Sequence, residues 1–178
     1  RIMLKKYISS NKNIYLRELM DIDVTQSYVD WLNNKEINQY LESRIVTHSL
    51  GTVKHYVKDL FESSDNMLFG VFDNSTDKHI GNIKLGNIDV FHRKADVGLI
   101  IGEKNYWGQG VATEMIKMIS KIAKIKFSLN KLYAGAYSVN IGSIRAFIKA
   151  GWGQEGIQKK QSKFNDLFVD NIIMGKIL

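Results

Sequence analysis

Hydrophobic positions in the first hundred residues repeat with two different periods, which predict alternating strands and helices. Short apolar or alternating runs predict strands over residues 14–19, 67–72, 80–88 and 95–101. Apolar side chains three or four positions apart predict helices over residues 23–34 and 50–61, with Asp23 as the cap of the first. Residues 41–48 are polar and charged and predict a loop or a short helix. The last three of these strands are joined by short turns, which indicates an antiparallel meander.

The second half of the chain begins with a strongly amphipathic helix over about residues 109–127. Its predicted buried stripe consists of Ala112, Met115, Ile116, Ile119, Ile122 and Ala123, and its lysines lie on the opposite face. A strand over residues 132–137 follows, and then a helix from Asn140 to Gly151. Two further strands are predicted over residues 156–162 and 168–175.

This element order predicts an α+β fold with a mixed sheet of about seven strands and about four helices. The strand–helix–strand unit near the middle implies one parallel strand pair inside a mostly antiparallel sheet. A length of 178 residues fits one domain, so we expect a single domain over residues 1–178 with its core starting at about residue 14.

Composition excludes several kinds of chemistry. The chain has no cysteine, which excludes disulfides, thiolate zinc sites and a cysteine nucleophile, and it indicates a cytoplasmic setting. The histidines are scattered, so we expect no metal. No apolar run approaches the roughly 20 residues that cross a bilayer, so we expect no membrane partner. Met3 is a candidate native start, with Arg1 and Ile2 as additions; whether they are additions stays open.

The net charge of +7 favours anionic partners, namely nucleic acid, a membrane surface or a phosphorylated small molecule. The alternative is an ordinary solvated surface, and the lysines of the helix over residues 109–127 fit that alternative. Nucleic-acid binders usually interleave aromatic side chains with their basic ones, which this helix does not do. Nucleic acid is therefore not the expected partner.

A glycine-bearing loop between a strand and a helix is the strongest local signal. It follows Ile101, contains Gly102, Gly108 and Gly110, and leads into the helix that begins near Gly110. Glycines let the backbone approach an anion closely, and the first N–H groups of a helix are unsatisfied and carry positive partial charge. The combination predicts a phosphate cradle.

The residues around this loop resemble the core motif of the GNAT acetyltransferases. That family has Arg/Gln-x-x-Gly-x-Gly/Ala where this chain has Trp107, Gly110 and Ala112. The Trp and the following Ala112-Thr113-Glu114 resemble the branch that acetylates the N-termini of ribosomal proteins, and its amino-sugar-acetylating relatives. A second motif runs from Asn140 through Ser143 to Phe147 and Gly151-Trp152, and resembles the family's Asn-x-x-Ser/Ala helix.

The resemblance implies a GNAT fold in which the strands over residues 95–101 and 132–137 splay apart, the first of them kinked by a bulge. Acetyl-CoA would lie in the gap as co-substrate, and an amine would attack its thioester directly in a ternary complex. The implied acetyl-CoA ligands are Leu99, Ile100, Ile101, Trp107, Gly108, Gln109, Gly110, Val111, Ala112, Thr113 and Asn140.

The proton chemistry departs from the better-known family pattern. Many relatives place a Tyr where this chain has Phe147, which has no proton to give. Ser143 is the substitute that the ribosomal-protein branch suggests, with Asn140 beside it as a further catalytic candidate. Glu103 is a candidate general base, and Asn82 is a second candidate that would act through a water.

The acceptor is less well specified than the donor. Glu42, Arg44 and His48 lie in the segment that shapes the acceptor pocket in the family, and with Asn82 they are the expected acceptor ligands. We favour a small amine such as a nucleotide-linked amino sugar. A protein N-terminus remains the alternative acceptor, and a non-enzymatic nucleic-acid-binding or acyl-CoA-sensing module the alternative class. The oligomeric state, including a homodimer, stays open.

Overall fold

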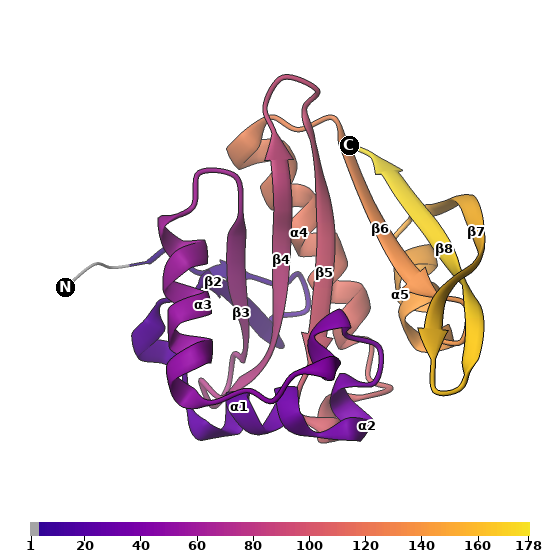
Figure 1. Cartoon of the computed structure of the whole chain (residues 1–178). Coiled ribbons are helices and arrows are strands. Elements are labelled where there is room, and N and C mark those ends of the chain that lie inside the picture. Colours follow the sequence, from indigo (N-terminus) through magenta and orange to yellow (C-terminus); the bar gives the residue numbers. More distant parts are fainter. Residues whose placement is uncertain (1–3) are drawn as a thin grey trace.

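The computed structural model describes residues 4–178, and all of the strands in that range belong to one mixed sheet (Figure 1). The strand order is β1-β2-β3-β4-β5-β6-β8-β7, and each neighbouring pair is antiparallel except β5 and β6. The strands are β1 (Tyr7–Ile8), β2 (Ile14–Glu18), β3 (Met67–Asp73), β4 (His79–Asp89), β5 (Lys94–Ile101), β6 (Lys131–Tyr137), β7 (Gly153–Phe164) and β8 (Leu167–Ile177).

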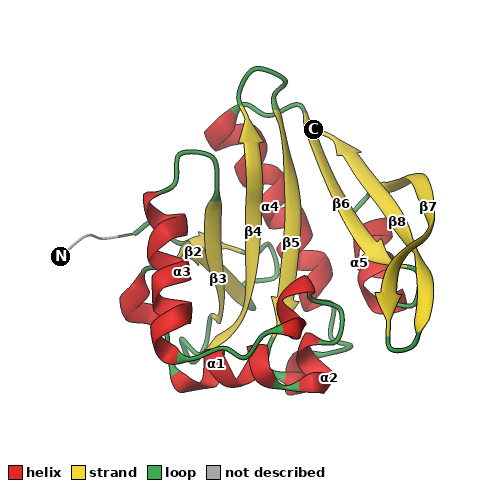
Figure 2. Ribbon diagram, viewed as in Figure 1, coloured by secondary structure: helices red, strands yellow, loops and turns green. Residues whose placement is uncertain are grey.

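Helices lie on both faces of the sheet, as Figure 2 shows. The α-helices are α1 (Gln26–Asn33), α2 (Lys35–Asn38), α3 (Leu50–Glu62), α4 (Val111–Phe127) and α5 (Ile141–Lys149). Short 3-10 turns precede α1, α3 and α4: η1 (Asp21–Asp23), η2 (Glu42–Ile45) and η3 (Lys104–Tyr106). On the face that carries α1 and α3, these helices cover β2 and β3, and no helix of residues 4–178 covers β6 and β8 there (Figure 1). No helix in the described part of the chain is both long and apolar enough to cross a membrane.

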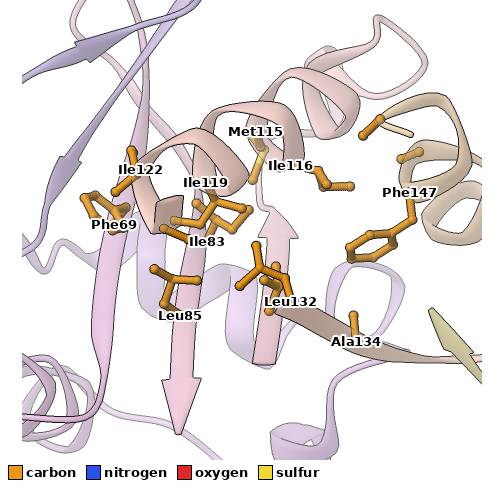
Figure 3. Packing of buried hydrophobic residues seen from close by; sticks show 14 of the residues in the cluster. Phe69, Ile83, Leu85, Met115, Ile116, Ile119, Ile122, Leu132, Ala134 and Phe147 are labelled. Carbon is orange, nitrogen blue, oxygen red and sulfur yellow. The ribbon is translucent and has the colours of Figure 1, made fainter. Parts of the chain in front are cut away.

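The main core lies between α4, α5 and the sheet (Figure 3). Met115, Ile116 and Ile119 of α4 are fully buried against Ile83 and Leu132 of β4 and β6. Removing apolar surface of this kind from water is the main stabilising term of the fold. A second cluster packs α1 and α3 against the other face of β2 and β3. The first cluster supports β4, β5 and β6 on the α4 side, and the second supports β2 and β3 on the opposite side.

The central strands β5 and β6 pair for only three residues and then separate. Their parallel pairing covers Lys94–Asp96 against Lys131–Tyr133. Beyond it β5 continues to Ile101 on β4, whereas β6 continues to Tyr137 on β8. The ribbons diverge visibly in Figure 1. One edge of β5 therefore faces an opening instead of a neighbouring strand, as the resemblance predicted.

The fold class is confirmed, with two additional elements and two corrections. The sheet has eight strands instead of seven, because the two-residue β1 is too short to leave a periodic pattern, and α2 is a single additional turn. Asp23 does not cap α1. Its carboxylate accepts bonds from Arg17 at 2.8 and 2.9 Å, while the Thr25 side chain caps the helix.

The second correction concerns the bulge. We expected it within residues 95–101, but β5 pairs with β4 without interruption from Asp96 to Ile101. The register shift lies at the other end of the hairpin, between Gly86 and Asp89 of β4, where Asn87 has φ of 49°. The half of β5 that borders the opening is therefore a regular strand. Its exposed edge arises from the divergence of β6 alone.

Candidate functional site

A cavity of about 490 Å³ occupies the opening between β5 and the start of α5, and we call it the donor cavity. The end of β5, the loop before α4, the α2 region and the first turn of α5 all contribute to it. Its lining residues are Glu36, Ile37, Gln39, Tyr40, Leu41, Leu99, Ile100, Ile101, Trp107, Gly108, Ala112, Val139, Asn140, Ile141, Gly142 and Ser143. Most residues expected to bind acetyl-CoA border this cavity or adjoin it in sequence.

The start of α4 presents unsatisfied backbone N–H groups beside the donor cavity. Gly110 is the N-cap residue and has no side chain to cap the helix, and the first helical bond is made only by the Glu114 N–H. Gly108 and Gly110 have φ of 72° and 78°, a conformation that glycine adopts without strain. A Cβ at either position would meet no atom within 4 Å, so nothing in the fold fills the space above them. This arrangement is suited to an anion.

The free edge of β5 presents further backbone groups to the opening. In an antiparallel ladder, successive residues point their N–H and C=O groups alternately to the two sides. The Gly102 N–H bonds to Ile80 of β4, so Leu99 and Ile101 direct theirs to the edge that β6 has left. The Trp107 indole donates to the Ile101 carbonyl at 3.0 Å. Trp107 thereby pins the loop to the strand end and forms part of the cavity wall.

The first turn of α5 contributes Ser143 and Asn140 to the donor cavity. The Asn140 side chain accepts a bond from the Ser143 N–H at 3.3 Å and caps the helix, so the structure gives Asn140 a local structural role. Phe147 does not border the cavity. It is 2% exposed and packs on Trp152, with ring centroids 4.7 Å apart, and Figure 3 shows it pointing toward Ala134.

A second cavity of about 330 Å³ lies on the α1 and α3 side of β5, and we call it the acceptor cavity. It is lined by Tyr28, Leu32, Leu41, Ser43, His48, Thr52, Val53, Tyr56, Leu68, Asn82, Lys84, Gly98, Leu99 and Ile100. It shares Leu41, Leu99 and Ile100 with the donor cavity, so the two cavities meet on either side of these residues.

The acceptor cavity contains one Lys and no carboxylate. Lys84 lies on β4, is partly buried, and forms no ion pair with any residue of the described range 4–178. Its side chain approaches the Asp96 carboxylate near Gly86, outside this cavity, without forming an ion pair with it. The ammonium group is therefore available to an anionic ligand group. We did not predict Lys84 from the sequence. The signal was present, because Lys84 follows Asn82 by two residues on the same face of a strand.

Asn82 lies at the wall of the acceptor cavity and is held there by His79. Asn82 is 4% exposed, and its Oδ1 lies 2.7 Å from His79 Nε2. Tyr28, Trp31 and Phe72 surround the imidazole, with ring centroids 4.9 to 5.6 Å away. Burial lowers the pKa of His79 and favours the neutral ring. A neutral ring protonated on Nε2 donates to Oδ1 and leaves the Asn82 amide nitrogen as a donor on the side of Tyr28, which also lines the cavity.

His48 is the histidine that lines the acceptor cavity. The Asn33 side chain fixes its backbone through bonds to the His48 N–H at 2.8 Å and from its own amide to the carbonyl at 2.9 Å. The ring Nε2 lies 3.1 Å from the Ser43 carbonyl, which can only accept, so Nε2 carries the proton. Nδ1 is then left as a proton acceptor.

Glu42 and Arg44 do not line the acceptor cavity, contrary to our expectation. Arg44 donates to the carbonyls of Leu41 at 2.7 Å and Lys163 at 2.8 Å, and to the Tyr137 hydroxyl at 3.0 Å. Glu42 accepts a bond from the same hydroxyl. These bonds tie η2 to β6 and to the β7–β8 hairpin. Arg44 therefore joins two walls of the site and has few donors left for a substrate.

Glu103 also lies outside both cavities. One carboxylate oxygen accepts from the Trp31 indole at 3.2 Å, and the other pairs with Lys78 at 3.3 Å. Both oxygens are thus engaged, one with α1 and the other with the turn between β3 and β4. This placement removes the geometric basis for Glu103 as general base. Within residues 4–178, no group of three or more His, Asp or Glu side chains is arranged to hold a metal ion.

Comparison with known proteins gives consistent matches. A family model described as "Acetyltransferase (GNAT) domain" matches residues 13–152. The Bacillus subtilis (strain 168) protein named "Probable N-acetyltransferase YjcK" is 28% identical over 170 residues, covering 92% of this chain and 93% of that protein.

Two solved structures share the fold along almost the whole chain. The spermidine N-acetyltransferase from Vibrio cholerae in complex with CoA and spermine superposes with a TM-score of 0.84 at 22% identity, covering 93% of this chain and 95% of that one. The ribosomal L7/L12 alpha-N-protein acetyltransferase RimL in complex with coenzyme A has a TM-score of 0.86 at 14% identity, covering 98% of both chains. At these identities the likeness establishes the fold.

Proposed function

This chain belongs to the GNAT acetyltransferase family and is an acetyl-CoA-dependent N-acetyltransferase, and from that premise we propose that its acceptor is a small primary amine that carries an anionic group. The observation that carries the proposal is Lys84. Lys84 is the one Lys that lines the acceptor cavity, and no carboxylate lines it. A nucleotide-linked or otherwise phosphorylated amino sugar belongs to this class.

The donor cavity fits acetyl-CoA on the residues that border it. The open cradle at Gly108 and Gly110, together with the backbone of Val111, Ala112 and Thr113, would hold the pyrophosphate. Gln109 adjoins this cradle, but its side-chain amide donates to the Asn105 carbonyl, so only its backbone would contribute. The free N–H groups of Leu99 and Ile101 would bind the pantetheine arm along β5. When bound, acetyl-CoA supplies the acetyl group as a thioester.

Direct transfer follows from the way the two cavities meet. An amine in the acceptor cavity and a thioester in the donor cavity would face each other at Leu99 and Ile100, with no need for an acyl-enzyme step. The chain has no cysteine to carry such an intermediate. A backbone N–H at the β5 edge would also stabilise negative charge on the thioester oxygen.

The proton steps have candidates on both sides of this junction. An ammonium acceptor must lose a proton before it attacks, and Nδ1 of His48 is the group in the acceptor cavity suited to take it. On the donor side, the Ser143 hydroxyl borders the cavity and would give a proton to the departing thiolate. We assign His48 the role first considered for Glu103. Asn82 would orient the acceptor by a hydrogen bond.

A polycationic acceptor fits this cavity poorly. The Vibrio cholerae structure contains spermine, which carries several positive charges. A cavity that presents Lys84 and no carboxylate would repel such a ligand.

A protein N-terminus remains the second candidate, because the RimL structure covers 98% of this chain. We retain residues 1–178 as one domain and a cytoplasmic location as predictions.

An acceptor screen tests the proposal. Release of free CoA thiol is measured with glucosamine 1-phosphate, glucosamine, spermidine and a short peptide with a free N-terminus. Glucosamine and its phosphate differ only by the anionic group, so they form a matched pair. We expect the phosphate to have the higher kcat/KM. Turnover of the peptide with none of the phosphate would establish the protein acceptor instead.

A further inference from the structure

Among the glycines of β3, β4, β5 and β6, Gly98 is the one at which the fold leaves room for a side chain. A Cβ added to Gly70 or Gly81 would lie 2.5 or 2.4 Å from a neighbouring atom, and at Gly86 or Gly135 it would lie 2.2 or 3.1 Å away. At Gly98 it would meet nothing within 4 Å, and the backbone there does not have positive φ. Glycine inside a strand weakens it and often marks a close approach by a ligand.

Gly98 lies between two hollows on the same face of the sheet. One is the acceptor cavity, and the other is a groove of about 370 Å³ that follows the front of the splayed strands. The groove is lined by Lys84, Asp96, Val97, Gly98, Tyr133, Ala134, Gly135, Asn171 and Ile173. Lys84 and Gly98 border both hollows and are direct partners across the β4–β5 ladder. Within the described part of the chain, no helix covers β6 and β8 on this face (Figure 1).

We propose that Gly98 is the crossing point of a two-part acceptor whose amine-bearing part lies in the acceptor cavity and whose second part lies in the groove along β6 and β8. The proposal rests on the proposed function and specifies its substrate class. The anionic link between the two parts lies beside Lys84, where the two hollows join. A side chain at position 98 would stand in the path of that link.

The lining of the groove indicates the chemistry of the second part. Tyr133 offers an aromatic ring, Asp96 a carboxylate, and Asn171 an amide that already bonds to Gln158 at 2.9 Å. Ring stacking on Tyr133 and hydrogen bonds to Asp96 suit a hydroxylated or heterocyclic group. An amino sugar joined through phosphate to a nucleoside has this combination of parts. Each hollow has a volume near the lower end of ordinary ligand sites, which run from about 300 to 1,000 Å³.

Three variants test the crossing with two acceptors. UDP-glucosamine and glucosamine 1-phosphate share the amine and the sugar phosphate, and the first adds a second phosphate and the nucleoside that the groove would hold. Gly98→Ala and Gly98→Val add side chains of increasing size at the crossing. Gly153→Val is the matched control, because Gly153 begins β7 and its Cβ would also meet nothing within 4 Å.

We expect the wild type to have a kcat/KM for UDP-glucosamine at least about tenfold above that for glucosamine 1-phosphate, one well-formed contact being worth that much. Gly98→Val should remove this advantage, Gly98→Ala should remove part of it, and Gly153→Val should leave it intact. The affinity for CoA and the thermal midpoint of all variants should match the wild type.

An unchanged ratio of the two acceptors in Gly98→Val would overturn the crossing while leaving the proposed function in place. Failure of the wild type to acetylate either amine would overturn the anionic acceptor itself. A Gly98→Val variant that unfolds is replaced by Gly98→Ala, for which a lowered ratio is still expected and an unchanged ratio still counts against the proposal.

Discussion

The donor and acceptor cavities meet at Leu99 and Ile100, but they are made from different parts of the chain. The donor cavity relies largely on backbone: the turn at Gly108 and Gly110, the start of α4 and the free edge of β5. The acceptor cavity relies on side chains from β4, α1, α3 and the η2 region. The backbone conformation of the donor cavity requires glycine at fixed positions, whereas the side chains that line the acceptor cavity can change one at a time. A sequence motif can therefore identify the donor molecule but not the acceptor.

The largest effect we expect is on the donor side. Gly110→Asp would place a carboxylate at the cap of α4, beside the phosphate cradle, and would disturb a residue with φ of 78°. Acetyl-CoA affinity should fall by about a hundredfold, near the upper end of the roughly 1.5–3 kcal/mol that a charge-assisted contact of this kind is worth. Calorimetry with CoA measures it, and Gly110→Ala separates backbone strain from charge. Equal affinity of Gly110→Asp and wild type would place the pyrophosphate elsewhere.

The next effect concerns the junction of the two cavities. Ser143→Ala removes the hydroxyl that we assign to the departing thiolate, so kcat should fall by about a hundredfold, the low end of proton-transfer effects. The KM for acetyl-CoA should change little, because the lost contact acts mainly in the transition state. Steady-state kinetics separate the two parameters. A wild-type kcat would mean that the thiolate leaves without help from Ser143.

The sequence predicted the fold better than it predicted the acceptor side of the site. Most strands and the helix over residues 111–127 were predictable, because their apolar periods match burial in the two cores. The acceptor side was not predictable from local patterns. Arg44 and Glu103 are charged residues in the right segments, but their partners lie 119 and 72 positions away in the chain at Lys163 and Trp31. Only the folded chain shows that these side chains are already engaged.

Arg44 gives a smaller effect that separates a structural residue from an acceptor ligand. Arg44→Ala loses bonds to two carbonyls and to Tyr137, so the free energy of unfolding should fall by about 1–2 kcal/mol, allowing for its partial exposure. Urea unfolding measures the loss, and Arg44→Lys should recover part of it. Acceptors of different charge should be affected equally. A selective loss for anionic amines would return Arg44 to the acceptor site.

The smallest effect is a pH dependence of stability from His79. Burial lowers the pKa of this imidazole below its ordinary value of 6.5, so between the two values the unfolded chain binds a proton that the folded chain does not. The free energy of unfolding should therefore decrease as pH falls below about 6.5. Asp23 and Arg17 lie near the ring, and the pKa of Asp23 is itself lowered, so its own contribution is lost only at lower pH.

His79→Gln should flatten this dependence while keeping a donor for Asn82. Urea unfolding at a series of pH values compares the variant with the wild type. Identical slopes in the two proteins would show that His79 does not remain neutral in the folded state.

Lys84 provides the most direct test of the acceptor assignment. The kcat/KM for glucosamine 1-phosphate and for glucosamine is measured in the wild type, in Lys84→Met and in Lys84→Arg. Loss of one charge-assisted contact is worth roughly 1.5–3 kcal/mol, so Lys84→Met should lower kcat/KM for the phosphate about tenfold to a hundredfold. The value for glucosamine and the KM for acetyl-CoA should hold, and Lys84→Arg should retain most of the activity. An equal loss for both amines, or no loss for the phosphate, would contradict an anionic acceptor held at Lys84.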